Sequence, residues 1–365
     1  MLAEDSYREV IGRAEVHVLN FLRAFERLQE EMHIAHIPSL QEKLKDTIGE
    51  MFTPLNAELA ALSPPEPLKD FHEKFSQALT DLADACTTFL NAASGQDFFP
   101  AFFHSRRAFS AGKYLLYDLR LHLPTLQQYW VLPEALPALS ELERKTPTVD
   151  EPVGFIHKER TDKRSDYSLY VPENYDPQRS WPLTICLHGG HGRGDDYILT
   201  WLRPAKSKGY LLLSPRSIDR TWSMQNPRFD IRSILHMLDE IFDVYAVDTR
   251  RIFLTGLSDG GTFTYAMGLM CARLFAGIAP VAAVLLPWLD LSQGKELPIL
   301  TIHGAKDFIF PVDYARAART MLEESGHLVL YKELPDWGHA YTYTINEQLI
   351  LPWFATLARP LAEER

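Results

Sequence analysis

Residues 250–263 constrain the fold of this chain most, because a strand pattern there runs into a helix pattern across a very tight turn. The apolar run 252–254 predicts a buried strand. Residues 256–260 read Gly-Leu-Ser-Asp-Gly, and the apolar run that starts at 263 is long enough for a helix. Strand, turn with a central serine, and helix in this order predict a nucleophile elbow.

The two glycines of this turn have a physical reason. A serine on so sharp a turn has a strained backbone, and side chains two positions before and after it, at Gly256 and Gly260, would collide with the neighbouring strand and helix. The following helix directs its N-terminus at Ser258, where free N–H groups favour developing negative charge. The pentapeptide alone is short enough to occur by chance, so its context carries the argument.

The chain has 365 residues and a net charge of −11, from 37 basic and 48 acidic residues. This length predicts two domains. We expect no nucleic-acid partner, because binding to phosphates needs clustered Lys and Arg and the chain has no long basic run. Three scattered cysteines do not suggest a disulfide framework. We find neither a signal-peptide pattern nor an apolar stretch of about 18 residues, so we expect a cytoplasmic protein without a membrane span.

Two patterns divide the chain. Residues 1–145 carry apolar residues at helical spacing, most clearly over 68–89, and predict an all-α helical bundle domain. Residues 146–152, with two prolines, predict a linker. From 153 to 365 strand patterns alternate with helix patterns, which predicts a mainly parallel sheet with helices on both faces. The helical domain leaves open whether it covers a site, forms a homo-oligomer or docks a partner.

A glycine-rich loop, residues 188–196, follows the predicted strand 183–187. It matches neither nucleotide-binding glycine pattern, so a phosphate site is disfavoured. Its two histidines and two aspartates could bind a metal, but their spacing fits no familiar site, and we predict no metal. We favour a loop that turns backbone N–H groups toward a substrate oxygen.

Two further polar residues follow predicted strands. Asp307 comes just after the strand 298–303, and His339 follows the strand 328–331. Open α/β sheets build their sites in loops beyond the carboxyl ends of parallel strands. Together with Ser258, these residues give the order Ser, Asp, His, with gaps of 49 and 32 residues.

A second aspartate, Asp336, lies only three residues before His339. In a Ser–His–Asp triad, the aspartate carboxylate must contact the imidazole at the ring nitrogen that faces away from the serine, here Ser258. A residue of the same short loop is poorly placed for this approach, whereas Asp307 leaves a neighbouring strand. We therefore favour Asp307.

With these residues in view, residues 153–365 resemble the α/β-hydrolase family, and within it the carboxylesterase/phospholipase-like esterases. The resemblance rests on LHGG at 187–190, GLSDGG at 256–261, HGAKDFIFPV at 303–312 and GH at 338–339. It implies the α/β-hydrolase fold. It also implies Ser258 as the nucleophile, His339 as general base and acid, and Asp307 as the group that orients the imidazole.

The resemblance further implies two backbone N–H groups of an oxyanion hole, from Asp259 and from Gly190, with His191 as a neighbouring candidate. His188 and His303 end strands and are interpreted as structural. Four aromatic residues in loops either line a substrate pocket or simply pack: Trp222, Trp288, Trp337 and Tyr341.

The sequence thus predicts a serine hydrolase that cleaves small-molecule carboxylic esters through an acyl-enzyme, without a metal or organic cofactor. A serine peptidase or thioesterase on the same triad is the nearest alternative. A non-catalytic binding module with a hydrolase fold is a third, although such a module has no need of all three triad residues.

Overall fold

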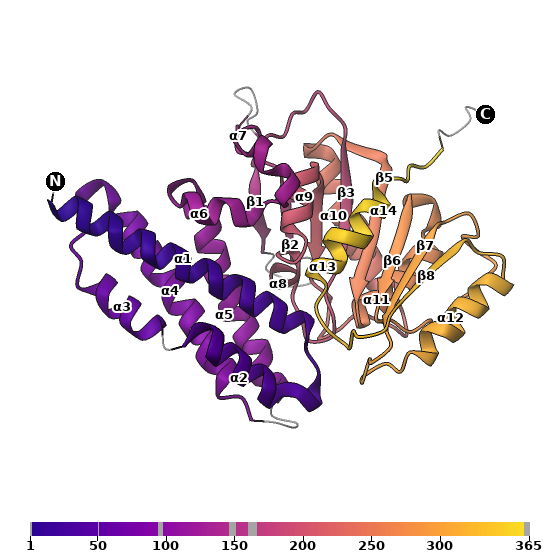
Figure 1. Cartoon of the computed structure of the whole chain (residues 1–365). Coiled ribbons are helices and arrows are strands. Elements are labelled where there is room, and N and C mark those ends of the chain that lie inside the picture. Colours follow the sequence, from indigo (N-terminus) through magenta and orange to yellow (C-terminus); the bar gives the residue numbers. More distant parts are fainter. Residues whose placement is uncertain (1, 50, 94–97, 146–150, 160–165, 361–365) are drawn as a thin grey trace. The chain divides into compact units, whose positions relative to one another are not determined.

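The computed structural model describes residues 2–49, 51–93, 98–145, 151–159 and 166–360. The chain separates into two compact units, Met1–Leu136 and Pro137–Arg365 (Figure 1). This division falls nine residues before the predicted end of the helical domain at residue 145. Residues 146–150 of the predicted linker lie outside the described residues.

The N-terminal unit is helical, as the sequence predicts. Its main helices are α1 (Leu2–Glu30), α2 (Ile37–Ile48), α3 (Phe52–Ala60), α4 (Lys69–Leu90) and α5 (Phe98–Leu119), followed by the short α6 (Pro124–Gln127). The stripe expected over 68–89 is the buried face of α4. Periodic apolar positions form these helices because each amphipathic helix must cover its apolar face with another.

The C-terminal unit holds a sheet of eight strands, counted over the described residues, in the order β1-β2-β4-β3-β5-β6-β7-β8. The strands are β1 (Gly154–Lys158), β2 (Tyr167–Val171), β3 (Trp181–Leu187), β4 (Leu211–Pro215), β5 (Val247–Leu257), β6 (Gly277–Val281), β7 (Ile299–Gly304) and β8 (Val329–Leu334). Strand β2 is antiparallel to both of its neighbours, and β4, β3, β5, β6, β7 and β8 run parallel. The mainly parallel sheet is therefore confirmed.

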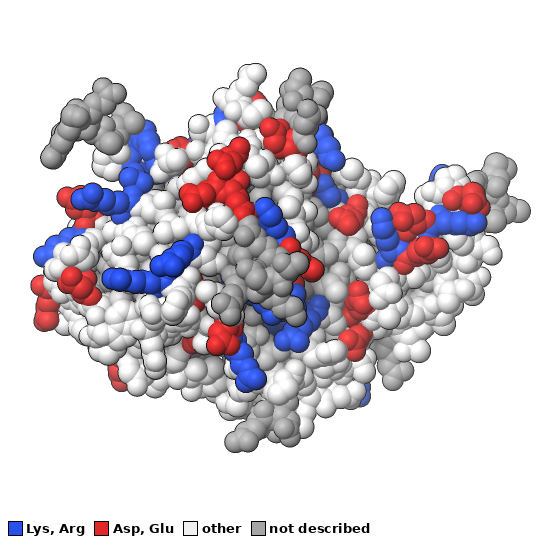
Figure 2. Space-filling view, turned by 180° about the vertical axis from the view of Figure 1, so that it is seen from behind, with Lys and Arg blue, Asp and Glu red and all other residues white. Residues whose placement is uncertain are grey.

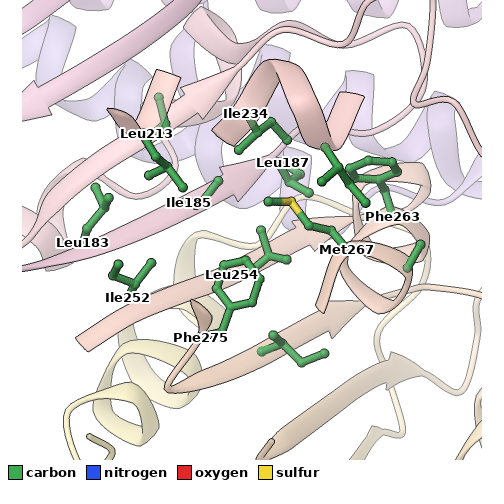
Figure 3. Packing of buried hydrophobic residues seen from close by; sticks show 14 of the residues in the cluster. Leu183, Ile185, Leu187, Leu213, Ile234, Ile252, Leu254, Phe263, Met267 and Phe275 are labelled. Carbon is green, nitrogen blue, oxygen red and sulfur yellow. The ribbon is translucent and has the colours of Figure 1, made fainter. Parts of the chain in front are cut away.

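Helices cover both faces of this sheet, because successive side chains of a strand point to opposite faces. Ile252 and Leu254 of β5 belong to one buried apolar cluster (Figure 3) together with residues of the helices α10 (Arg228–Val244) and α11 (Asp259–Met270). Phe253, between them, stacks on Phe354 with 4.4 Å between ring centroids. The other helices of this unit are α7 (Leu139–Leu142), α8 (Gly194–Ile198), α9 (Leu202–Lys208), α12 (Asp313–Glu324), α13 (Tyr343–Ile345) and α14 (Leu351–Phe354).

Two observations bear on the predicted absence of a nucleic-acid partner and of a membrane span. Lys and Arg side chains are interspersed with Asp and Glu on the face shown in Figure 2, rather than gathered into one basic area. In the part of the chain that the structure describes, we find no helix with the length and apolar character that a bilayer crossing requires.

Candidate active site

Ser258 lies at the turn between β5 and α11, with φ 60° and ψ −119°. A positive φ is costly for a residue with a side chain and persists only where surrounding contacts impose it. Here the Ser258 N–H donates to the Val281 carbonyl oxygen at 2.9 Å. A Cβ on Gly260 would lie within 3 Å of the Leu187 carbonyl oxygen, so only glycine lets α11 approach β3 this closely. The turn is thus the strained elbow expected from the sequence.

Asp307 and His339 meet although 32 residues separate them. Their loops follow the adjacent strands β7 and β8, and the His339 Nδ1 lies 2.8 Å from the Asp307 Oδ2. The Asp307 side chain is fully buried and that of His339 is 8% exposed. With Nδ1 engaged by the carboxylate, Nε2 is the ring nitrogen left to act on a reacting group.

The Asp307 carboxylate is held from several sides. Its Oδ1 accepts backbone hydrogen bonds from Ile309 at 2.9 Å and from Phe310 at 2.7 Å. The His303 Nε2 lies 3.3 Å from the Oδ2. Burial alone raises the pKa of Asp307, but hydrogen bonds from His303 and His339 outweigh it and hold the pKa below its ordinary value. Asp307 is therefore an anion at neutral pH.

His303, which the sequence predicts to be structural, is a neighbour of Asp307. Its ring is buried, and its Nε2 lies 2.8 Å from the Phe310 carbonyl oxygen, which can only accept, so this nitrogen carries the proton. The same N–H faces Asp307. The signal in the sequence is a histidine at a strand end, four residues before the aspartate.

Asp336, the other candidate for the acid of the triad, lies at the surface. Its side chain is 89% exposed and pairs with the Lys306 Nζ at 2.7 Å. The carboxylate that the structure brings to His339 is Asp307.

The loop after β3 lies against the nucleophile elbow, since a Cβ on Gly189 would be 3.4 Å from the Ser258 Cβ. The His191 N–H donates to the Arg220 carbonyl oxygen at 2.9 Å, so it is already engaged. Within the described part of the chain, the Gly190 N–H has no acceptor. As the first residue of α11, Asp259 has an N–H without an intrahelical acceptor.

His188 sits beneath this loop. Its ring is buried, the Nδ1 lies 2.8 Å from the Gly189 carbonyl oxygen, and the Nε2 accepts from the Ser217 N–H at 3.2 Å. Burial lowers the pKa of His188 to about 4, so the ring is neutral at pH 7. Both nitrogens are engaged, and the described residues contain no group of three or more side chains able to hold a metal.

Burial decides between pocket lining and packing for one of the four aromatic candidates, Trp222. Trp222 is 2% exposed and stacks on Phe263 with 5.0 Å between centroids, so it packs in the interior. Trp288 is 49% exposed. Trp337 and Tyr341 are partly buried in the loop that carries His339.

Comparison with known proteins supports a family assignment. The family model of phospholipases and carboxylesterases matches residues 217–350. Feruloyl esterase C of Emericella nidulans is 28% identical over 198 residues, which cover 52% of this chain and 70% of that protein. A bifunctional acetylxylan esterase/xylanase of Neocallimastix patriciarum is 30% identical over 147 residues, or 39% of this chain and 21% of that protein.

The chain can also be aligned with solved structures. A thermostable esterase aligns with a TM-score of 0.48 at 24% identity, over 56% of this chain and 63% of that one. The chain spans about a fifth of the bifunctional enzyme and about seven tenths of feruloyl esterase C. The sequence matches, together with the mainly parallel sheet, support an α/β-hydrolase, carboxylesterase-like family for the C-terminal unit.

Proposed function

We propose that this protein is a serine hydrolase that cleaves carboxylic esters through an acyl-enzyme, with Ser258, His339 and Asp307 as its triad. The observation that carries the proposal is the buried Asp307 bonded at 2.8 Å to the His339 Nδ1, on the same edge of the sheet as a serine with positive φ. A pure binding module has no need of this arrangement.

The first half-reaction follows from this geometry. The Ser258 Oγ attacks the ester carbonyl carbon while the His339 Nε2 takes the hydroxyl proton. Asp307 fixes the imidazole with its proton on Nδ1 and stabilises the imidazolium that forms. The imidazolium then returns the proton to the departing alkoxide as the C–O bond breaks, which leaves an acyl ester on Ser258.

Water completes the reaction by the same route in reverse. His339 removes a proton from the water as its oxygen attacks the acyl carbon, and the serine leaves with that proton. In both tetrahedral intermediates the oxyanion would accept hydrogen bonds from the Gly190 and Asp259 N–H groups. Donors of this kind are worth about 10²–10³-fold each in turnover.

The relatives suggest a range of substrates to test. Two of them are named as feruloyl and acetylxylan esterases, which favours small aryl and acetyl esters. An acyl-protein thioesterase of Gibberella zeae, 29% identical over 101 residues, keeps thioester hydrolysis as the second candidate. We propose oxoesters first, because the two longest of these matches are to oxoester hydrolases.

A fluorophosphonate label with mass mapping of the modified residue tests the nucleophile. We expect modification at Ser258 and about a 10⁶-fold loss of turnover in Ser258→Ala. Ser292→Ala, at an exposed serine of the same unit, is the matched control and should keep full activity. Labelling at another serine would refute the triad. A panel of p-nitrophenyl acetate, methyl ferulate and an acyl thioester then separates the two substrate classes.

A further inference from the structure

The loop of residues 217–223, which follows β4, contacts both the glycine-rich loop of residues 188–196, here called the oxyanion loop, and the elbow. The Arg220 carbonyl oxygen accepts from the His191 N–H at 2.9 Å, and the Ser217 N–H donates to the His188 Nε2 at 3.2 Å. The Trp222 Nε1 donates to the His188 carbonyl oxygen at 2.8 Å. These bonds occupy backbone groups on both sides of Gly190, and among the residues that the structure describes its own N–H has no acceptor.

Thr221 joins this loop to the residue after the nucleophile. Its hydroxyl donates to the Asp259 Oδ2 at 2.5 Å. A Cβ on Gly190 would lie 2.6 Å from the same oxygen, so the Asp259 carboxylate packs directly against the backbone of Gly190. Thr221 therefore fixes where the Asp259 side chain stands relative to Gly190.

Asp230 holds the loop itself. This carboxylate, at the start of α10, is 1% exposed. Its Oδ1 accepts from the Ile218 N–H at 2.9 Å and its Oδ2 from the Ser223 N–H at 2.8 Å. A buried carboxylate with two backbone donors is a rigid support, because losing either bond leaves a buried group unsatisfied.

We propose that residues 217–223, clamped by Asp230, position the two oxyanion donors Gly190 and Asp259, with Thr221 and Asp230 as positioning residues. The inference rests on the proposed ester hydrolysis and deepens it. Hydrogen-bond donors stabilise an oxyanion only when they are already placed, since reorganising them during the reaction consumes the gain.

The test is a pair of esters that differ only at the carbonyl atom: p-nitrophenyl acetate and its thionoester, in which C=S replaces C=O. Sulfur accepts hydrogen bonds weakly, so a well-placed oxyanion hole favours the oxoester. We expect Thr221→Val to lower kcat/KM for the oxoester by about tenfold or more, mainly through kcat, and that for the thionoester by less. Thr221→Ser, which keeps the hydroxyl, should restore the wild-type ratio of kcat/KM for the oxoester to kcat/KM for the thionoester.

Thr301→Val is the control, since the Thr301 hydroxyl also bonds a side chain, the Tyr265 hydroxyl at 2.7 Å, but this bond joins β7 to α11 and does not involve residues 217–223. It should lower the melting temperature without moving the oxoester/thionoester ratio. Asp230→Asn should lower the ratio, and Thr221→Val decides the question if that variant does not fold. Equal losses on both esters, or none, in Thr221→Val would overturn the inference while leaving ester hydrolysis standing. A wild-type protein inactive on both esters would overturn both.

Discussion

Two neighbouring aspartates show how environment decides the role of one residue type. Asp307 is buried and accepts from backbone and imidazole donors, whereas Asp336 is exposed and pairs with a lysine. The carboxylate of the proposed triad must be fixed to orient the imidazole, and of these two aspartates only Asp307 is held by buried hydrogen bonds. The same chemistry at the surface leaves the side chain free to move.

Asp307→Asn should therefore lower turnover by about 10⁴-fold, because the amide cannot hold His339 in the required tautomer. Asp336→Asn should lower it by less than about tenfold, because that tautomer is unaffected. Steady-state kinetics of the two folded variants on one ester measures the difference. The reverse ranking would make Asp336 the acid.

His188 gives a pH dependence of stability. Its pKa is about 4 in the folded protein and about 6.5 in an unfolded chain, so unfolding takes up a proton between these values. The free energy of unfolding that depends on a neutral His188 is therefore fully present above about pH 6.5 and decreases as the pH falls toward 4. The free energy of unfolding of the wild type should fall more steeply in this window than that of His188→Gln, by up to about 1.4 kcal/mol per pH unit. Urea titrations at several pH values measure both slopes, and equal slopes would contradict the prediction.

At the scale of elements, the elbow depends on how closely α11 approaches β3. Glycine at 260 allows this approach because any Cβ there would meet the backbone of the residues that end β3. Gly12, in α1, is the opposite case, since nothing lies within 4 Å of a Cβ built on it. At Gly260 the neighbouring backbone leaves no room for a side chain, whereas at Gly12 the glycine only lowers the helix propensity of α1.

Gly260→Ala should lower the melting temperature and abolish activity, because the helix must shift away from the strand. Gly12→Ala should instead stabilise the helical unit by about 0.5–1 kcal/mol, because alanine favours a helix interior. Thermal unfolding of both variants, with ester hydrolysis of the first, is the measurement. A folded and active Gly260→Ala would mean that the elbow tolerates a wider turn.

At the scale of the whole molecule, residues before the predicted linker belong to the C-terminal unit. Glu143 lies 3.2 Å from the Nζ of Lys206, whose side chain is 1% exposed and also pairs with Glu173. Removing one partner of a buried charge is costly, because the remaining charge is left undersolvated. The segment that starts at Pro137 therefore contributes a partner for a buried charge of this unit.

We expect a fragment of residues 137–365 to be more stable to urea than one of 150–365, which lacks Glu143. Glu143→Gln in the full chain reports on the same contact without truncation and should also lower the midpoint. Equal midpoints for the two fragments would show that Glu173 alone satisfies Lys206.

The predicted role of the helical unit in access to the site is tested with the longer fragment. If its preference among esters of graded acyl length differs from that of the full chain, the helical unit shapes access. A matching preference would exclude that role.

The sequence by itself determined the strand–turn–helix around Ser258 and the alternation that makes the sheet parallel. These features are local, since periodicity and glycine positions act over a few residues. The loops that carry Asp307 and His339 could also be placed, because parallel strands end on one edge of the sheet.

Only the tertiary structure decided the rest, because it depends on contacts between distant residues. The bond from His303 to Asp307 needs the geometry of a folded loop. The donation of the His191 N–H to Arg220 depends on a loop 29 residues away. The hydrogen bonds from residues 217–223 to Asp230 could not be predicted from the sequence either, because residue spacing does not show which backbone N–H groups a buried carboxylate will contact.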